Sequence, residues 1–155
     1  MTSWNDVLAD APDLAERVQA RFQSAKHHTL ATLRRDGSPR ISGTEITFSV
    51  GNAWLGGMHG ARKAQDLQRD PRFALHSSTA DETLADGDAR ISGHAVEVTD
   101  PAEIARVYEG ISIPEGPMHL FRIEVDELVL TRVEDDELVV DWWRAGQGAQ
   151  QVKRR

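Results

Sequence analysis

Apolar and polar residues alternate along much of this chain, and the alternation predicts β-strands joined by short turns. It is clearest near the C-terminus, where Leu128 and Leu130 face one way and Val129 and Val133 face the other. The acidic residues 134–136 come next and predict a hairpin turn. We predict strands over residues 30–33, 40–50, 53–58, 72–76, 88–98, 118–125, 128–133 and 138–143.

Short helices are predicted around these strands. Leu14, Val18 and Phe22 recur at helical spacing, which predicts a helix over residues 11–24. Two further helices are predicted over residues 62–69 and 101–109.

The pattern of strands and helices indicates the fold class. The connections after Gly51 and Glu134 are too short for parallel crossovers, so the strands that they join must be antiparallel. Strands with only short helices between them favour a mainly β (α+β) antiparallel barrel over a doubly wound sheet. We predict a single domain over residues 1–155, with the barrel at about 28–143 and a polar tail at about 145–155.

Composition and charge argue against several classes of function. A net charge of −7 and a pI of about 5.3 argue against binding to nucleic acid or to an anionic membrane. No apolar run approaches the roughly 20 residues of a membrane-spanning helix. The first ten residues lack the features of a secretory signal, so we expect a cytoplasmic location. The absence of cysteine excludes disulfides, thiolate catalysis and cysteine-ligated metals.

A cationic helix start follows a glycine-rich strand end. Arg62 and Lys63 open the helix, next to free backbone N–H groups around residues 60–61. Because a helix N-terminus attracts anions, this segment predicts a phosphate site, although a solvated basic helix face is the alternative. Arg40 begins a strand and could reach the same anion or pair with Asp36.

Four short segments, taken in order, resemble one known family. They are 30–33 (Leu-Ala-Thr-Leu), 36–40 (Asp-Gly-Ser-Pro-Arg), 62–67 (Arg-Lys-Ala-Gln-Asp-Leu) and 70–72 (Asp-Pro-Arg). The arrangement extends over about residues 25–143 and resembles the split β-barrel flavoproteins of the pyridoxamine 5′-phosphate oxidase type, which include relatives that use the deazaflavin F-420. The resemblance implies a split β-barrel and a homodimer with the cofactor in a groove shared by the two subunits.

The resemblance also implies cofactor-binding positions. Arg62 and Lys63 match residues that contact the flavin phosphate, residues 40–44 match a segment that lies along the flavin, and residues 56–58 match a cofactor-contacting strand end. Of the two adjacent C-terminal tryptophans, alternation sends one to the core, and the other could stack near the cofactor of the neighbouring subunit, as in the oxidases. The predicted cofactor-binding residues are Arg40, Ile41, Ser42, Gly43, Thr44, Gly56, Gly57, Met58, Arg62, Lys63 and Trp143.

The chain also departs from the oxidase pattern. Glu45 stands where the oxidases have a lysine, and their C-terminal Arg-His region has no counterpart. Both differences argue against vitamin B6 phosphate as the substrate, and the first weakens the case for FMN. The acidic tail of F-420 would instead profit from cations such as Arg40, Arg72 and Arg90. We therefore predict an oxidoreductase that uses FMN, or alternatively F-420, to transfer hydride to or from a small unidentified substrate.

A second hypothesis is a non-catalytic carrier or sensor for a flavin, haem or an apolar ligand, since a fold does not dictate function. His76, His94 or His119 could then ligate haem. No pair of histidines has the spacing of a zinc site, so no metal site is predicted. The sequence has no nucleophile elbow, Walker loop or paired-carboxylate signature, and no catalytic residue is assigned.

Overall fold

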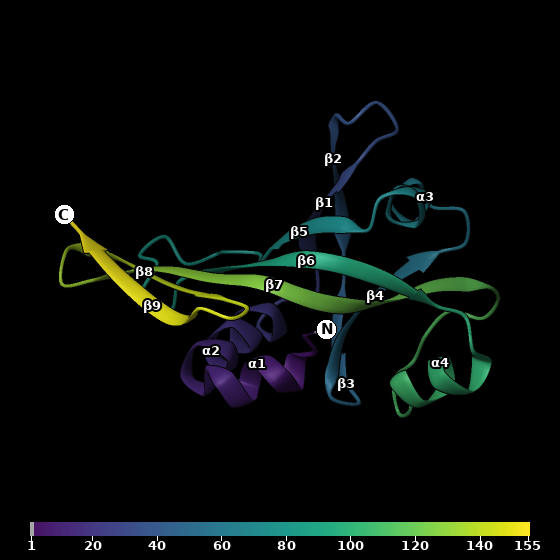
Figure 1. Ribbon diagram of the computed structural model, residues 1–155, viewed down its shortest axis with the longest axis horizontal. Helices are drawn as coiled ribbons and strands as arrows, with labels where there is room; N and C mark the ends of the chain where they lie inside the picture. Colours follow the sequence, from purple (N-terminus) through teal and green to yellow (C-terminus); the bar gives the residue numbers. More distant parts are fainter. Residues whose placement is uncertain (1) are drawn as a thin grey trace.

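The computed structural model describes residues 2–155, which form one nine-stranded sheet and four helices (Figure 1). The helices are α1 (Trp4–Asp10), α2 (Pro12–Gln23), α3 (Arg62–Arg69) and α4 (Pro101–Val107). The strands are β1 (His28–Leu33), β2 (Pro39–Thr44), β3 (Ile46–Ser49), β4 (Asn52–Met58), β5 (Arg72–His76), β6 (Asp88–Val98), β7 (Met118–Glu134), β8 (Glu137–Arg144) and β9 (Gly148–Arg154).

The sheet is antiparallel throughout, and its two end strands are consecutive in the chain. The strand order is β2-β1-β5-β6-β7-β4-β3, and β8 and β9 extend it from the second half of β7. β2 and β3 stand at opposite ends of this order, yet only Glu45 separates them in the chain. The two end strands therefore meet near Glu45, which bends the sheet into a barrel. The predicted antiparallel barrel with a few short helices is confirmed.

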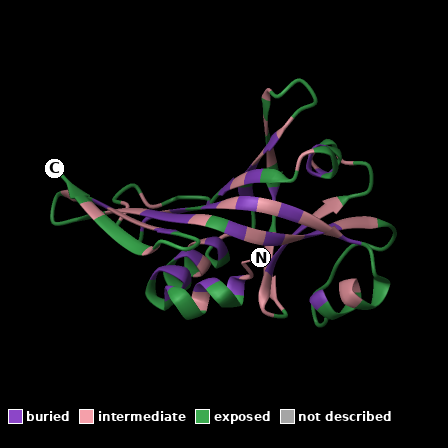
Figure 2. Cartoon of the chain, viewed as in Figure 1, coloured by how far each residue is buried: buried purple, intermediate pink, exposed green. Residues whose placement is uncertain are grey.

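The core lies mainly between the sheet and the two N-terminal helices (Figure 2). Helical spacing turns Val18 and Phe22 of α2 toward the sheet, where they join a buried cluster that includes Ile91 and Leu130. A smaller apolar cluster lies under α4 around Val107. None of the helices in residues 2–155 is long and apolar enough to cross a membrane.

Several strand boundaries follow the prediction and others do not. β5 and β6 have the predicted bounds. The single strand predicted over residues 40–50 is wrong, because barrel closure turns the chain at Glu45 and divides it into β2 and β3. The two strands predicted over residues 118–133 form one strand, β7, which pairs with β4 in its first half and β8 in its second.

Both chain ends contain elements that the sequence analysis did not predict. The polar tail predicted at 145–155 is wrong, since β9 pairs with β8 along its whole length. Most β9 side chains are exposed, so the strand shows no alternation. At the other end, α1 begins with a capping box in which the Ser3 hydroxyl accepts from the Asp6 N–H at 3.1 Å and the Ser3 N–H donates to the Asp6 carboxylate at 2.9 Å.

Candidate functional site

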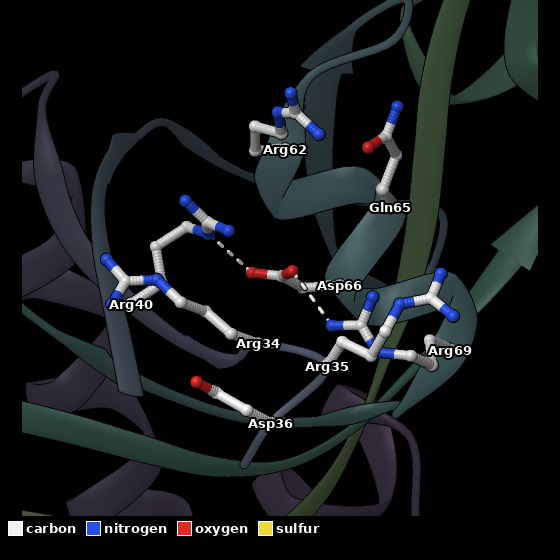
Figure 3. A pocket seen from close by; sticks show the side chains of 8 residues that line it. All are labelled: Arg34, Arg35, Asp36, Arg40, Arg62, Gln65, Asp66 and Arg69. Carbon is white, nitrogen blue, oxygen red and sulfur yellow. Dashed lines mark hydrogen bonds and ion pairs between the residues drawn. The ribbon is translucent and has the colours of Figure 1, made fainter. Parts of the chain in front are cut away.

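Two cavities adjoin the start of α3. The first, which we call the arginine pocket, has a volume of about 410 Å³ (Figure 3). It is lined by Arg34, Arg35, Asp36, Arg40, Arg62, Gln65, Asp66 and Arg69. The second, the glycine-lined cavity, has a volume of about 590 Å³ and lies between the end of β2, β3, the end of β4, the start of α3 and the α4–β7 loop. Arg62 lines the first cavity and its neighbour Lys63 lines the second.

The arginine pocket is strongly cationic although the chain is acidic. Five arginines and two aspartates line it, a formal surplus of three positive charges in a chain of net charge −7. Arg40 Nε lies 2.7 Å from Asp66 Oδ2, and Arg69 Nη2 lies 3.0 Å from Asp66 Oδ1. The other three arginines are exposed and make no side-chain hydrogen bond or ion pair with residues 2–155. The pocket can therefore bind an anionic group.

Lys63 brings a cation to the wall of the glycine-lined cavity. Its Nζ donates a hydrogen bond of 3.0 Å to the carbonyl of Gly43, at the outer edge of β2. Burial lowers the pKa of Lys63, and the negative charge of Glu45 partly opposes this effect. Glu45 lines the same cavity and pairs with Lys26 at 3.5 Å. The cavity thus holds charges of both signs at one side.

A tyrosine and apolar side chains complete the glycine-lined cavity. The apolar side chains in its wall include Met58, Met118 and, from the α4–β7 loop, Ile111, Ile113, Pro114 and Pro117. The Tyr108 hydroxyl stands beside Gly56, where an added Cβ would lie 2.7 Å from its oxygen. Burial raises the pKa of Tyr108, and the charge of Glu45 raises it further. The phenol is therefore protonated at neutral pH and can donate a hydrogen bond into the cavity.

Most predicted cofactor-binding residues surround these two cavities. Arg40 and Arg62 line the arginine pocket, whereas Gly43, Thr44, Gly56, Gly57, Met58 and Lys63 line the glycine-lined cavity. Ile41 and Ser42 line neither, and Ile41 is 74% exposed on β2. Trp143 is a core residue, and its indole N–H donates to Asp10 at 2.7 Å. The structure thus brings together the cations and the glycines, and it places Trp143 apart from them.

Other residues of the site were not singled out from the sequence. Helical spacing could have grouped Arg62, Asp66 and Arg69, which lie at i, i+4 and i+7 on one face of α3. Residues 34–35 belong to the β1–β2 turn and approach α3 only through the tertiary fold. Tyr108 has no sequence signal beyond being the single tyrosine of the chain.

Two arginines considered for an acidic cofactor tail have partners elsewhere. The guanidinium of Arg72 pairs with the carboxylate of Asp70 at 2.7 Å, and that of Arg90 lies 3.9 Å from Glu127. Neither arginine lines the arginine pocket or the glycine-lined cavity.

The histidines considered as haem ligands also lie outside both cavities. His76 and His94 contact the Ser77 carbonyl and the Asp126 carboxylate, each through Nδ1. His119 Nδ1 lies 2.8 Å from Glu97, and its Nε2 accepts from the Gly60 N–H at 3.2 Å. Among residues 2–155, no three His, Asp or Glu side chains are grouped so that they could hold a metal ion.

The two cavities suit one ligand that has an acidic end and a planar end. Arg40 and Gly43 are three residues apart on β2, which is roughly 10 Å along a strand. An added Cβ at Gly43 would meet nothing within 4 Å, so this part of the wall is open. Because Arg62 and Lys63 are consecutive on α3, an anion in the first cavity and a ring in the second can belong to the same molecule.

The sequence of this chain matches the profile of one protein family. The sequence profile described as Pyridoxamine 5′-phosphate oxidase matches residues 14–132 of this chain. No curated protein matches it.

Solved structures share the fold. Rv2991, a conserved hypothetical protein of Mycobacterium tuberculosis, is 23% identical with a TM-score of 0.62, over 73% of this chain and 81% of its own. PhzG from Burkholderia lata 383, in complex with tetrahydrophenazine-1-carboxylic acid, is 16% identical with a TM-score of 0.67, over 98% and 95%. A pyridoxamine 5′-phosphate oxidase-related, FMN binding protein of Nostoc punctiforme PCC 73102 is 11% identical with a TM-score of 0.65, over 94% and 96%. At these identities the likeness shows the fold.

Proposed function

This chain belongs to the pyridoxamine 5′-phosphate oxidase family, and we propose that it is an oxidoreductase that uses F-420 or FMN to transfer hydride to or from a small substrate. The observation that carries the proposal is the pair of cavities at the start of α3, one cationic and one walled by glycines and apolar side chains. The arginine pocket receives the acidic end of the cofactor, and the glycine-lined cavity receives its ring. Such a cofactor supplies the hydride chemistry, while the protein binds and orients it.

Charge distinguishes the two cofactors. FMN ends in a single phosphate, whereas F-420 adds a phosphodiester and an acidic glutamyl tail. The surplus of three positive charges in the arginine pocket exceeds what one phosphate neutralises. Glu45, where the oxidases have a lysine, removes one positive contact to FMN. We expect F-420 to bind more tightly than FMN, and FMN more tightly than riboflavin, which has no phosphate.

Replacing both cations at the start of α3 tests the site. In Arg62→Ala combined with Lys63→Ala, affinity for FMN and F-420 should fall by about ten-fold or more. Arg62 loses a charge-assisted hydrogen bond to the acidic end, worth about 1.5–3 kcal/mol, and Lys63 loses a positive charge beside the ring. Fluorescence titration with FMN, FAD, F-420 and riboflavin measures these affinities. Arg72→Ala is the matched control, since Arg72 pairs with Asp70 outside both cavities and its loss should leave the affinities unchanged.

The visible spectrum of the purified protein gives an independent check. Absorption of a bound flavin or deazaflavin supports the proposal, whereas a Soret band supports the haem-carrier hypothesis. A wild-type protein that binds none of the tested cofactors contradicts the proposed function.

A further inference from the structure

Asp66 lies at the centre of the arginine pocket and connects three elements of the fold (Figure 3). Its side chain, on α3, is only 3% exposed. Its carboxylate accepts hydrogen bonds from Thr32 Oγ1 on β1 at 2.7 Å and from Arg40 Nε on β2 at 2.7 Å. A third comes from Arg69 Nη2 at 3.0 Å. The carboxylate is thus fixed from three sides.

Packing alone gives no reason for a carboxylate at this position. Burial by itself would raise the pKa of Asp66, but the hydrogen bonds from Arg40, Thr32 and Arg69 outweigh it and lower the pKa, so the group is ionised. A buried charge is costly to desolvate, and an apolar side chain of similar volume often serves stability as well or better. A buried ion pair is thus weak evidence for a purely stabilising role, and the free nitrogens of Arg40 point to a second one.

Arg40 keeps nitrogens that are able to bind an anion. Its Nε is bonded to Asp66, while Nη1 and Nη2 have no acceptor among residues 2–155. The Arg40 side chain is only 26% exposed, so its guanidinium is held by the fold. Arg69 is held by Asp66 through a terminal nitrogen instead, since its Nη2 donates both to Asp66 and to the Leu33 carbonyl at 2.7 Å. Asp66 thus fixes one edge of the Arg40 guanidinium and leaves the terminal nitrogens available.

We propose that Asp66 is a positioning residue, which holds Arg40 by its Nε so that the terminal nitrogens bind the acidic end of the cofactor. The inference rests on the proposed function. For the loss of the Asp66 carboxylate, it predicts a change in anion affinity opposite to the one expected from charge alone. Removing a carboxylate makes the pocket more positive and, by charge alone, would strengthen anion binding. Loss of positioning weakens it.

Asp66→Asn separates these two effects. The variant keeps the shape of the side chain but removes the charge that holds Arg40. We expect the FMN dissociation constant, measured by fluorescence, to rise about ten-fold while that of riboflavin is unchanged. If the wild type prefers F-420, the same comparison uses F-420 and its phosphate-free deazaflavin core. If Asp66 had only a structural role, its loss would weaken the binding of both ligands of a pair alike. The decisive quantity is therefore the ratio of the affinities for the phosphorylated and the phosphate-free ligand.

Two matched variants serve as controls. Asp36 is the other carboxylate of the arginine pocket, and among residues 2–155 its side chain accepts hydrogen bonds from Ser38 alone. Asp36→Asn removes the same charge without touching Arg40, so FMN affinity should stay the same or rise. In an Arg40→Ala background, Asp66→Asn should cause no further loss of FMN affinity, because the two residues act as one unit.

The inference is overturned if Asp66→Asn binds FMN as tightly as the wild type or more tightly, or if its effect adds fully to that of Arg40→Ala. Circular dichroism monitors folding. If Asp66→Asn does not fold, Arg40→Lys keeps the charge but replaces the guanidinium by a single ammonium nitrogen, which cannot be held at one nitrogen while two others bind the anion. Unchanged FMN affinity in Arg40→Lys would then overturn the inference. A wild type that binds no phosphorylated cofactor would instead contradict the proposed function itself.

Discussion

Among individual side chains, Lys63 should make cofactor binding depend on pH. Burial lowers its pKa, and Glu45 only partly opposes the effect. The ammonium form binds anions, and it is lost as pH rises through a pKa below the ordinary lysine value of about 10.4. Affinity for FMN or F-420 should therefore fall at alkaline pH earlier than with an exposed lysine. Over the same window the unliganded protein gains stability, because the unfolded chain holds the proton more tightly.

Comparison with Lys63→Arg isolates this titration. Arginine keeps its charge across the alkaline range, so its contribution to anion binding does not change with pH. The ratio of the wild-type and variant dissociation constants, measured from about pH 7 to 10, also cancels any titration of the cofactor. A ratio that is constant with pH would show that the charge of Lys63 does not contribute to cofactor binding.

Site residues could be predicted from the sequence where they are grouped by positions close together in the chain. Arg62 and Lys63 belong to one helix start, so their joint role could be predicted. Their division between two cavities could not, because it depends on how α3 packs against β2. Trp143 shows a further limit. Alternation separates the adjacent indoles onto opposite faces, but it does not reveal which face α1 and α2 cover. The hydrogen-bond partner of Trp143, Asp10, is 133 positions away in sequence.

Among the strands, the pairing of β6 with β7 depends on one glycine. The register shifts between Ser92 and Gly93, and a Cβ at residue 93 would lie 1.9 Å from the carbonyl oxygen of Glu124. This oxygen belongs to the backbone of the paired strand and cannot move aside alone. Gly93→Ala should therefore destabilise the protein by about 3 kcal/mol, measured by urea unfolding.

Gly43→Ala provides the comparison for this effect. An added Cβ at Gly43 would meet nothing within 4 Å. Its stability should be unchanged or higher by up to about 1 kcal/mol, since alanine restricts the unfolded chain. Similar unfolding midpoints for Gly93→Ala and Gly43→Ala would contradict the steric account of the bulge.

Alternation predicts the strands that have one buried face. β5 is an example, because Phe73 and Leu75 are buried and the strand has the predicted bounds. β9 lacks the signal, because it is an edge strand whose side chains are mostly exposed. The local signal for its pairing with β8 is the three-residue turn at 145–147, in which Gly146 has a positive φ. The two halves of β7 have different partners, which a local pattern does not reveal.

For the molecule as a whole, the sequence predicted the barrel but not its strand order. Short turns make β3–β4 and β7–β8 antiparallel hairpins, and these could be read from the turn residues. The pairs β1–β5 and β4–β7 join segments far apart in the chain. Those long-range pairs bring β2, α3 and the α4–β7 loop together and so create the glycine-lined cavity.

Exposed apolar side chains at the glycine-lined cavity fit the homodimer that the family resemblance implies. Met58 is 82% exposed, Ile111 46% and Ile113 37%, and all three line the cavity. Ile41, 74% exposed, lies on the adjoining strand β2. Clustered apolar surface of this kind marks an interaction site. The arrangement fits the interface implied by the family resemblance, with a second copy of the chain covering the cofactor ring.

Lysine substitutions on this surface test the dimer. Light scattering of the wild type should give twice the chain mass of 17.2 kDa. Ile41→Lys combined with Met58→Lys should give monomers, because the interface would have to bury two unpaired charges. Val133→Lys with Leu138→Lys is the matched control, since both residues are 37% exposed and lie at the opposite end of β7 from the cavity. Cofactor affinity should be lower in the monomeric variant, because an uncovered ring stays in contact with water. A wild type that is monomeric and still binds the cofactor would refute the shared site.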